Sequence, residues 1–429
     1  MKTIFKNVTL LAETGYGDGN WNVIIENKRI ANITKELPDA NGANVIDAEG
    51  NLLIPGFYNA HTHAAMTLFR GYGEDLPLQR WLEERIFPAE DRLNYENVTV
   101  ATRLAIAEML KGGIVSFSDM YMFEDAVAEV VLETGVKANL SRALVSFSPD
   151  ASIATDSRFA QAKALVEKYQ DADDERVKVD FSLHAEYTNL PHYIAQVSEY
   201  TAANNLRMHL HVSETEKEHN ECIARHQKTP TKLFYDLGAL DTPTLAAHCV
   251  WVSDEDIAMM AEKKVSVVHN PISNLKLGSG VMPLGKMLKA GVNVCLGTDG
   301  VASNNRLDIL REMQTAAILH KGILLDPTAT TASQMPKLAT RNGAIAQGRT
   351  DCGEISIGAR ADLVLIDRNS VHNMPCFDDY AMLCYSAERS DVLLTMVDGR
   401  ILSQNGTYTL IDEERLRYDA QKVFAHYFD

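Results

Sequence analysis

Two kinds of sequence alternate regularly between residues 50 and 300. Short apolar or β-branched runs are typical of buried parallel strands, and the longer amphipathic stretches between them are typical of helices. Eight such runs occur in order, at Leu52–Asn59, Gly113–Asp119, Val136–Leu144, Val177–His184, Arg207–Val212, Thr244–Cys249, Val265–His269 and Val292–Leu296. Eight strands over about 250 residues, each followed by helical sequence, predict an α/β fold of the (β/α)8 type, the TIM barrel.

Both ends of the chain differ from this central part. Residues 1–55 contain short strand candidates interrupted by Gly and Asn, and residues 355–410 contain further strands and a tight Asp398-Gly399 turn. Neither piece holds enough strands for a sandwich of its own. We therefore expect the two pieces to pair into one small β-sandwich domain flanking a barrel of residues 56–354, with a C-terminal helix at 411–429.

The charge balance restricts the possible partners. Lysine and arginine total 41 against 58 acidic residues, which gives a formal net charge of −17. Such an acidic surface repels phosphate backbones, and no basic patch stands out in the sequence, so we expect no binding to nucleic acid. A small nucleoside remains a compatible ligand.

The six cysteines bear on the compartment. They are scattered and form no CxxC pair, which suits a reducing environment. The first residues alternate like a strand and lack the apolar stretch of a signal peptide, and no apolar run is long enough to cross a bilayer. We expect a cytoplasmic protein with no membrane partner.

Two histidines close the first predicted strand, in the stretch Asn59-Ala60-His61-Thr62-His63. Side chains two positions apart on a strand share a face, so we expect both imidazoles at the barrel mouth, where one ion could bridge them. Taken alone, this HxH pattern is as typical of polar residues at a strand end as of a metal site.

Further residues of metal-ligand and proton-transfer types follow three other predicted strands. The fifth strand ends at His211 and is followed by Glu214, the sixth reaches His248, and the eighth is followed by Asp299. These positions lie at the C-terminal face, where the active sites of TIM barrels are built. Packing does not explain them, because each buried polar group would need a partner. The combination predicts a metal centre.

Two more histidines and one missing lysine refine this prediction. His209 shares a face with His211 but lies one layer deeper, which favours a core histidine with a satisfied hydrogen bond. His269, at the end of the seventh strand, is as consistent with shaping the pocket as with touching substrate. Two-metal barrels need a bridging group at the end of the fourth strand, commonly a lysine, and here Lys178 lies near the beginning of that strand. A single metal ion is therefore favoured.

Taken together, these motifs resemble those of the amidohydrolase superfamily. They are most similar to its branch of 5′-methylthioadenosine/S-adenosylhomocysteine deaminases, and the resemblance covers nearly the whole chain, including the flanking β domain. It is carried by His61-Thr62-His63, His211 with Glu214, Ala247-His248-Cys249, the stretch from His269 to Gly278, and the stretch from Gly297 to Asn305.

The resemblance implies a metal-dependent aminohydrolase. Its reaction would be the hydrolytic deamination of 5′-methylthioadenosine, S-adenosylhomocysteine or adenosine at C6, giving an inosine-type product and ammonia. Glu214 would pass a proton to the ring N1, His248 would orient the attacking oxygen, and Asp299 would accept a proton from water. We also expect a homo-oligomer, because barrels of this type often associate. One Zn²⁺ per subunit, or Fe²⁺ in its place, would be bound by His61, His63, His211 and Asp299.

The resemblance also implies a set of substrate-binding residues. Glu90 falls where the family has its ribose-binding glutamate, although a solvated glutamate at a helix start is an equally good interpretation of the sequence. Arg142 matches an arginine that holds the amino-acid tail of S-adenosylhomocysteine, and Arg158 is a looser match. His184 matches a substrate histidine and Ser303 a serine of the pocket.

The chain departs from this family just after His184. Relatives usually carry Pro-Tyr there, whereas this chain has Glu186-Tyr187. A carboxylate near the purine pocket would repel an anionic substrate or bind a different base edge, so the departure puts the substrate in doubt but leaves the reaction type unchanged.

Three other interpretations stay open at this point. The same residues would serve a guanine deaminase, another aromatic-amine deaminase or a triazine-type hydrolase, since all of these attack an sp2 ring carbon. A non-catalytic barrel scaffold is disfavoured because all the predicted ligands are present. A two-metal cyclic amidase is disfavoured by the missing lysine.

Overall fold

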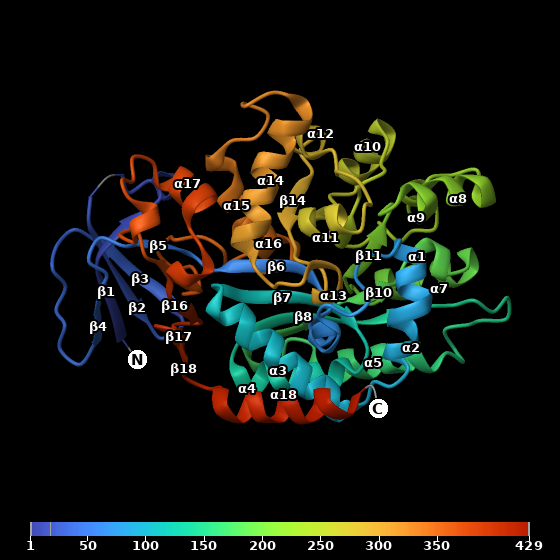
Figure 1. Ribbon diagram of the computed structural model, residues 1–429, viewed down its shortest axis with the longest axis horizontal. Helices are drawn as coiled ribbons and strands as arrows, with labels where there is room; N and C mark the ends of the chain where they lie inside the picture. Colours follow the sequence, from blue (N-terminus) through green and yellow to red (C-terminus); the bar gives the residue numbers. More distant parts are fainter. Residues whose placement is uncertain (1, 18, 428–429) are drawn as a thin grey trace.

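The computed structural model describes residues 2–17 and 19–427 and consists of a barrel with a β domain at one side (Figure 1). The predicted parallel barrel is confirmed, and its strands neighbour one another in chain order. They are β6 (Phe57–Thr62), β7 (Ile114–Tyr121), β8 (Lys137–Leu144), β9 (Val177–Val179) with β10 (Phe181–Leu183), β11 (Met208–Val212), β12 (Thr244–His248), β13 (Ser266–His269) and β14 (Asn293–Leu296).

Two of the predicted strands are divided in the structure. The run Leu52–Asn59 breaks at Gly56, so that its first half belongs to the flanking sheet and its second half to the barrel. A Cβ atom at Gly56 would lie 2.2 Å from the Val115 side chain, so only glycine allows this close approach. The fourth predicted strand is interrupted at the buried Asp180, which accepts hydrogen bonds from Asn139.

The β domain joins the two ends of the chain, as predicted. β5 pairs antiparallel with β15, which aligns Leu53 with Leu365, and side chains from both ends, Phe5 and Leu363 among them, share one buried core. In Figure 1 this domain holds the deep blue and red segments at the left. Its strands are β1 (Lys2–Leu10), β2 (Trp21–Glu26), β3 (Arg29–Thr34), β4 (Asn44–Asp47), β5 (Leu52–Pro55), β15 (Leu363–Ile366), β16 (Val392–Val397), β17 (Arg400–Gln404) and β18 (Thr407–Tyr408).

The helices cover the outside of the barrel (Figure 1), and their ends follow local sequence signals. Before the third helix, for example, Asn94 and Asn97 exchange side-chain-to-backbone hydrogen bonds, and Gly112 follows its last residue. The main helices are α2 (Phe87–Glu90), α3 (Tyr95–Lys111), α4 (Glu124–Thr134), α5 (Ser157–Tyr169), α7 (Pro191–Ala203), α8 (Glu216–His226), α9 (Pro230–Asp236), α10 (Asp254–Glu262), α11 (Pro271–Lys276), α12 (Leu284–Lys289), α13 (Val301–Asn304), α14 (Ile309–Leu324), α15 (Met335–Ala339), α16 (Arg341–Ala346) and α18 (Glu413–Tyr427).

Hydrogen bonds just beyond β14 connect it to β6 and close the barrel at its mouth. The backbone N–H of Asp299 donates to the carbonyl of His61 at 2.9 Å, and that of Thr298 donates to the side chain of Asn59 at 2.9 Å. A Cβ atom at Gly297 would lie 2.5 Å from the Asn270 side chain, so this approach too requires glycine. The closure brings together the first and last barrel strands, which carry or precede predicted metal ligands.

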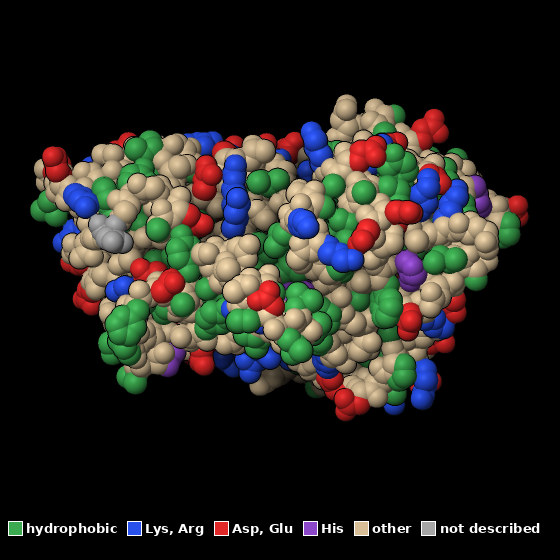
Figure 2. All heavy atoms as spheres, turned by 90° about the horizontal axis from the view of Figure 1, so that it is seen from above, with side chains coloured by type: hydrophobic (Ala, Val, Ile, Leu, Met, Phe, Trp, Pro, Cys, Tyr) green, Lys and Arg blue, Asp and Glu red, His purple; other side chains and the backbone are tan. Residues whose placement is uncertain are grey.

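The surface carries charges of both signs. On the face seen in Figure 2, acidic and basic side chains are interspersed and no large basic patch is visible. Within the described part of the chain, no helix is both long and apolar enough to cross a membrane.

Candidate active site

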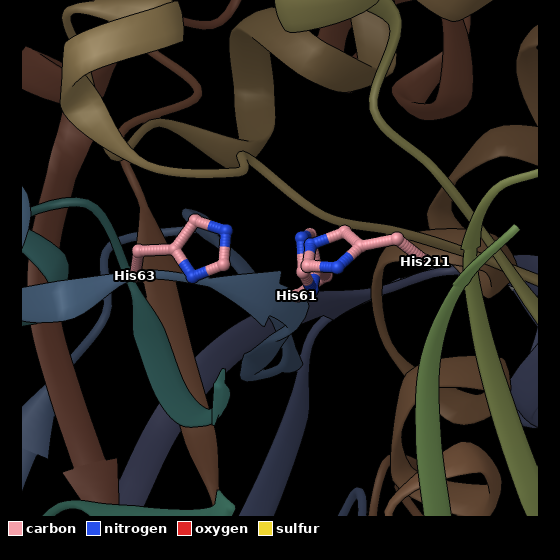
Figure 3. Close-up of side chains that lie close together, drawn as sticks. All are labelled: His61, His63 and His211. Atoms are coloured by element: carbon pink, nitrogen blue, oxygen red, sulfur yellow. The ribbon is translucent and has the colours of Figure 1, made fainter. Parts of the chain in front are cut away.

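Five side chains of metal-ligand type converge at the mouth of the barrel, the four predicted ligands and His248. Ligand atoms of His61, His63 and His211 lie within 4.8 Å of one another, and those of His61, His248 and Asp299 do so as well. Figure 3 shows His63 approaching from the side opposite His61 and His211. Oδ1 of Asp299 lies 3.4 Å from Nε2 of His61 and 3.2 Å from Nε2 of His63.

Hydrogen bonds fix which nitrogen of each histidine faces this centre. Nδ1 of His63 donates to the carbonyl of Met120 at 2.7 Å, and Nδ1 of His211 donates to the carbonyl of His184 at 2.6 Å. Because a carbonyl only accepts, Nδ1 of both rings carries the hydrogen and Nε2 is left with its lone pair in the neutral ring. The two rings are therefore preset to act as Nε2 ligands.

His61 is oriented by a histidine to which the sequence assigned only a core role. Nδ1 of His61 lies 2.9 Å from Nε2 of His209, and both rings are fully buried. Nε2 of His61 makes no hydrogen bond to any described residue, and its lone pair is available for an ion in the tautomer whose Nδ1 donates to His209. The signal for His209 was its spacing, since it shares a strand face with His211.

The protonation states of His61 and His211 suit the binding of a cation, and that of His63 does not. Burial lowers the pKa of His61 to about 4 and that of His211 well below 6.5, so both rings are neutral. At His63 the effect of burial is outweighed by the Asp299 carboxylate, and the pKa is raised to about 9. Binding of an ion at this ring therefore has to release a proton.

Asp299 is held by two serine hydroxyls and by its backbone. Ser273 and Ser303 donate to Oδ2 at 2.6 Å and 2.9 Å, which leaves Oδ1 facing the histidines. Asp299 has a φ of 60°, and His248 at the end of β12 has a φ of 73°. Left-handed backbone at non-glycine residues is strained and clusters at functional sites, where it redirects side chains.

Glu214 and His248 lie beside the four predicted metal ligands, His61, His63, His211 and Asp299. Oε2 of Glu214 is 3.9 Å from Nε2 of His248, whose Nδ1 donates to Oδ1 of Asn274 at 2.8 Å. Ser279 donates to Oε1 of Glu214 at 3.4 Å. Burial raises the pKa of Glu214, and His248 partly offsets that effect. A carboxyl group with a raised pKa is suited to donating a proton near neutral pH.

One cavity of about 370 Å³ contains nearly all the side chains that the sequence singled out. Of the predicted catalytic, metal-binding and substrate-binding residues, all but His61 line it, together with apolar side chains such as Met66, Leu78 and Trp81. Concave, mostly apolar cavities with a few converging polar groups are typical ligand sites. The predicted residues in the wall are His63, Glu90, Arg142, Arg158, His184, His211, Glu214, His248, Asp299 and Ser303.

Glu90 faces this cavity and is tied to the neighbouring strand. The Tyr121 hydroxyl donates to Oε1 of Glu90 at 2.6 Å. Burial raises the pKa of Glu90 to about 7, although the Tyr121 hydrogen bond acts in the opposite direction. A solvated helix-start glutamate would have neither feature, so the structure favours the pocket over that alternative.

Two arginines line the part of the cavity beyond β8. Nε of Arg142 donates to Gln161 at 2.9 Å and Nη1 donates to the carbonyl of Ala143 at 2.7 Å. Burial and the nearby Arg158 lower the pKa of Arg142. His184 bonds to Thr188 through Nδ1 at 3.2 Å, and its ring centroid lies 4.9 Å from that of His211.

Two expectations from the sequence are corrected. Glu186 does not line the cavity, because its buried carboxylate pairs with Arg225 at 2.6 Å. Tyr187 lines the cavity instead. His269 is not in the wall either, since it packs against His320 with 3.2 Å between their Nε2 atoms. The lysine of the fourth strand, Lys178, pairs with Asp171 outside the cavity.

The sequence matches the amidohydrolase family over residues 52–402. It is 43% identical to a 5′-deoxyadenosine deaminase of Methanosarcina acetivorans over 97% of this chain and 96% of that protein. It is 42% identical to a 5-methylthioadenosine/S-adenosylhomocysteine deaminase of Moorella thermoacetica over 97% of each. The fold is similar to the crystal structure of an adenosine deaminase from Xanthomonas campestris with bound zinc, with a TM-score of 0.92 and 32% identity over 99% of this chain and 98% of that one. The chain belongs to the amidohydrolase family.

Proposed function

We propose that this enzyme deaminates adenine-type nucleosides by hydrolysis, with 5′-deoxyadenosine, 5′-methylthioadenosine, S-adenosylhomocysteine and adenosine as candidate substrates. The observation that carries the proposal is that one cavity wall holds three of the four predicted metal ligands, a carboxyl group with a raised pKa, Glu214, and a second carboxyl group, Glu90. The names of the two similar deaminases support the same class of substrate.

The donor set fits one zinc ion. Three imidazole nitrogens and one carboxylate oxygen suit Zn²⁺, and Fe²⁺ is the other candidate for such a set. When bound, the ion supplies a Lewis acid that makes water a good nucleophile near neutral pH. His61, His63, His211 and Asp299 would hold it.

The residues around the ligands divide the proton transfers between them. Glu214, whose pKa is raised by burial, donates a proton to the ring N1 and so makes C6 of the purine electrophilic. His248, held by the hydrogen bond from its Nδ1 to Asn274, directs Nε2 toward the attacking water. Asp299 accepts the proton that this water loses, and the two serines hold the carboxylate in place meanwhile.

The far side of the cavity recognises the sugar and its 5′ substituent. Ionised Glu90, oriented by Tyr121, accepts hydrogen bonds from the ribose hydroxyls. Arg142 and Arg158 offer guanidinium groups to the carboxylate of an S-adenosylhomocysteine tail. His184 and Ser303 complete the polar contacts to the substrate.

Ammonia release from a substrate panel tests this proposal. Purified protein is incubated with 5′-deoxyadenosine, 5′-methylthioadenosine, S-adenosylhomocysteine, adenosine, guanine and a chlorotriazine, and chloride release is measured for the chlorotriazine. We expect ammonia from the adenine nucleosides and none from guanine. Turnover of guanine or of the triazine alone would instead support the alternative hydrolases, and inactivity towards every compound with no bound metal would support a scaffold.

A further inference from the structure

A large aromatic side chain at the rim of the cavity has no role in the reaction described so far. Phe147 lines the cavity, yet 70% of its side chain is exposed to solvent. Phe87 on α2 is a second rim aromatic with 42% exposure. Exposed apolar side chains at the edge of a concave site mark surfaces that a ligand covers.

The backbone next to Phe147 is fixed. The N–H of Ser146 donates to the carbonyl of Thr188 at 2.8 Å and forms a bridge with the 188–189 segment. The Asn189 side chain donates to the carbonyl of Leu144 at 3.1 Å, a second hydrogen bond that fixes the same stretch of chain. The ring of Phe147 is therefore presented to the cavity from an anchored position, and little ordering of the chain opposes its contact with a ligand.

Phe147 lines the cavity together with Arg142, the residue proposed above to bind the 5′ tail of a nucleoside. Arg142 on β8 is in register with Tyr121 on β7, which holds Glu90, and Phe147 follows five residues after Arg142. In the proposed binding mode the base lies at the metal ligands and the ribose at Glu90, so that the 5′ group extends toward Arg142. Val145 and Met122 add apolar wall there.

We infer that Phe147 is a specificity-determining residue that packs on an apolar 5′ substituent, and this inference rests on the proposed nucleoside deamination. A 5′-methyl or methylthio group gains from losing its contact with water against the ring, and a thioether sulfur also interacts favourably with an aromatic edge. The 5′-hydroxyl of adenosine loses hydrogen bonds to water at an apolar surface and gains nothing in return. Phe147 thus favours 5′-deoxy and 5′-thioether nucleosides over adenosine.

The test is a comparison of kcat/KM for 5′-deoxyadenosine, 5′-methylthioadenosine and adenosine. Phe147→Ala is expected to lower kcat/KM about tenfold for the first two substrates, mainly through KM, and less than about twofold for adenosine. Phe147→Leu keeps apolar bulk without a ring, so it should restore 5′-deoxyadenosine more fully than 5′-methylthioadenosine. Phe377→Ala is the matched control, because Phe377 is 95% exposed and lies outside the cavity wall.

The outcomes distinguish failure of the proposed role of Phe147 from failure of the proposed function. If the native enzyme deaminates nucleosides but Phe147→Ala leaves the ratio between methylthioadenosine and adenosine unchanged, the inference is wrong and the proposed function stands. Equal losses on all three substrates would likewise contradict a specificity role. If the native enzyme deaminates no nucleoside, the proposed function fails and the inference fails with it.

Discussion

One carboxylate oxygen of Glu218 accepts a hydrogen bond from the backbone N–H of Glu214 at 2.7 Å. The other oxygen accepts from the N–H of Ser213 at 2.9 Å, at a residue whose φ of 48° turns the chain sharply after β11. Burial and the nearby Glu214 raise the pKa of Glu218 to about 8. Glu218 does not line the cavity, so it acts as a positioning residue that aims Glu214 at the site.

Replacement of Glu218 by glutamine is expected to lower kcat by about tenfold to a hundredfold, with little change in KM or metal content. A glutamine NH₂ would face one of the two backbone N–H donors, so the turn would open and misplace Glu214. Steady-state kinetics and metal analysis give the readout, with Glu216→Gln, an exposed position on the same helix, as the control. In a Glu214→Gln background the further loss should be small, and full additivity would contradict the positioning role.

Glu214→Gln itself is expected to lower kcat by about 10²- to 10⁴-fold, the range for loss of a general acid. Glutamine is close to isosteric but has no proton to give to the ring N1. Metal content should stay at the native level, because Glu214 lies outside the ligand group. Near-native turnover in this variant would show that another group supplies the proton.

The pH dependence of kcat/KM should contain a contribution from Glu90. Its pKa is raised to about 7, so below that pH most molecules carry the protonated form, which accepts ribose hydroxyls poorly. Nucleoside capture should therefore weaken as the pH falls from 8 to 6. Glu90→Gln cannot ionise at this position. The variant should therefore show a higher KM at pH 8, and its kcat/KM should not fall further for this reason between pH 8 and pH 6. If kcat/KM of the variant fell in the same way from pH 8 to pH 6, the proposed role of Glu90 would be wrong.

Stability should depend on a buried lysine between the two domains. Nζ of Lys137 on β8 lies 2.7 Å from carboxylate oxygens of Asp362 and Asp398 in the β domain, and all three side chains are almost fully buried. Lys137→Met leaves the buried Asp362 carboxylate without its cation, whereas Asp398 keeps Arg176 and Arg360, so we expect a loss of about 3–5 kcal/mol in denaturant unfolding. Lys286→Met removes an exposed pair with Asp254 and should change little. Similar losses in both variants would contradict this account.

The sequence predicted the barrel and the convergence of its strand ends because both follow from local patterns. Apolar runs give the strands, and parallel strands end at one face, so His61, His211 and Asp299 had to approach one another. The chemistry of these residue types then indicates a metal. Self-association stays a prediction.

Other features depend on tertiary contacts that no local pattern encodes. The hydrogen bonds from Tyr121 to Glu90 and from Ser273 to Asp299 join residues that are 31 and 26 positions apart in the chain. Glu186 follows the pocket residue His184 so closely that its sequence position suggested contact with the purine. Its direction is decided by Arg225 on α8, a partner 39 positions away.

Deamination of 5′-deoxyadenosine as a function of metal content is the most direct test of the whole account. Enzyme stripped with a chelator and reloaded with graded Zn²⁺ is assayed for ammonia and for bound metal in the same samples. The account predicts activity that rises in proportion to bound metal and saturates at one ion per chain. Full activity in the stripped enzyme, or no ammonia at full occupancy, would contradict it.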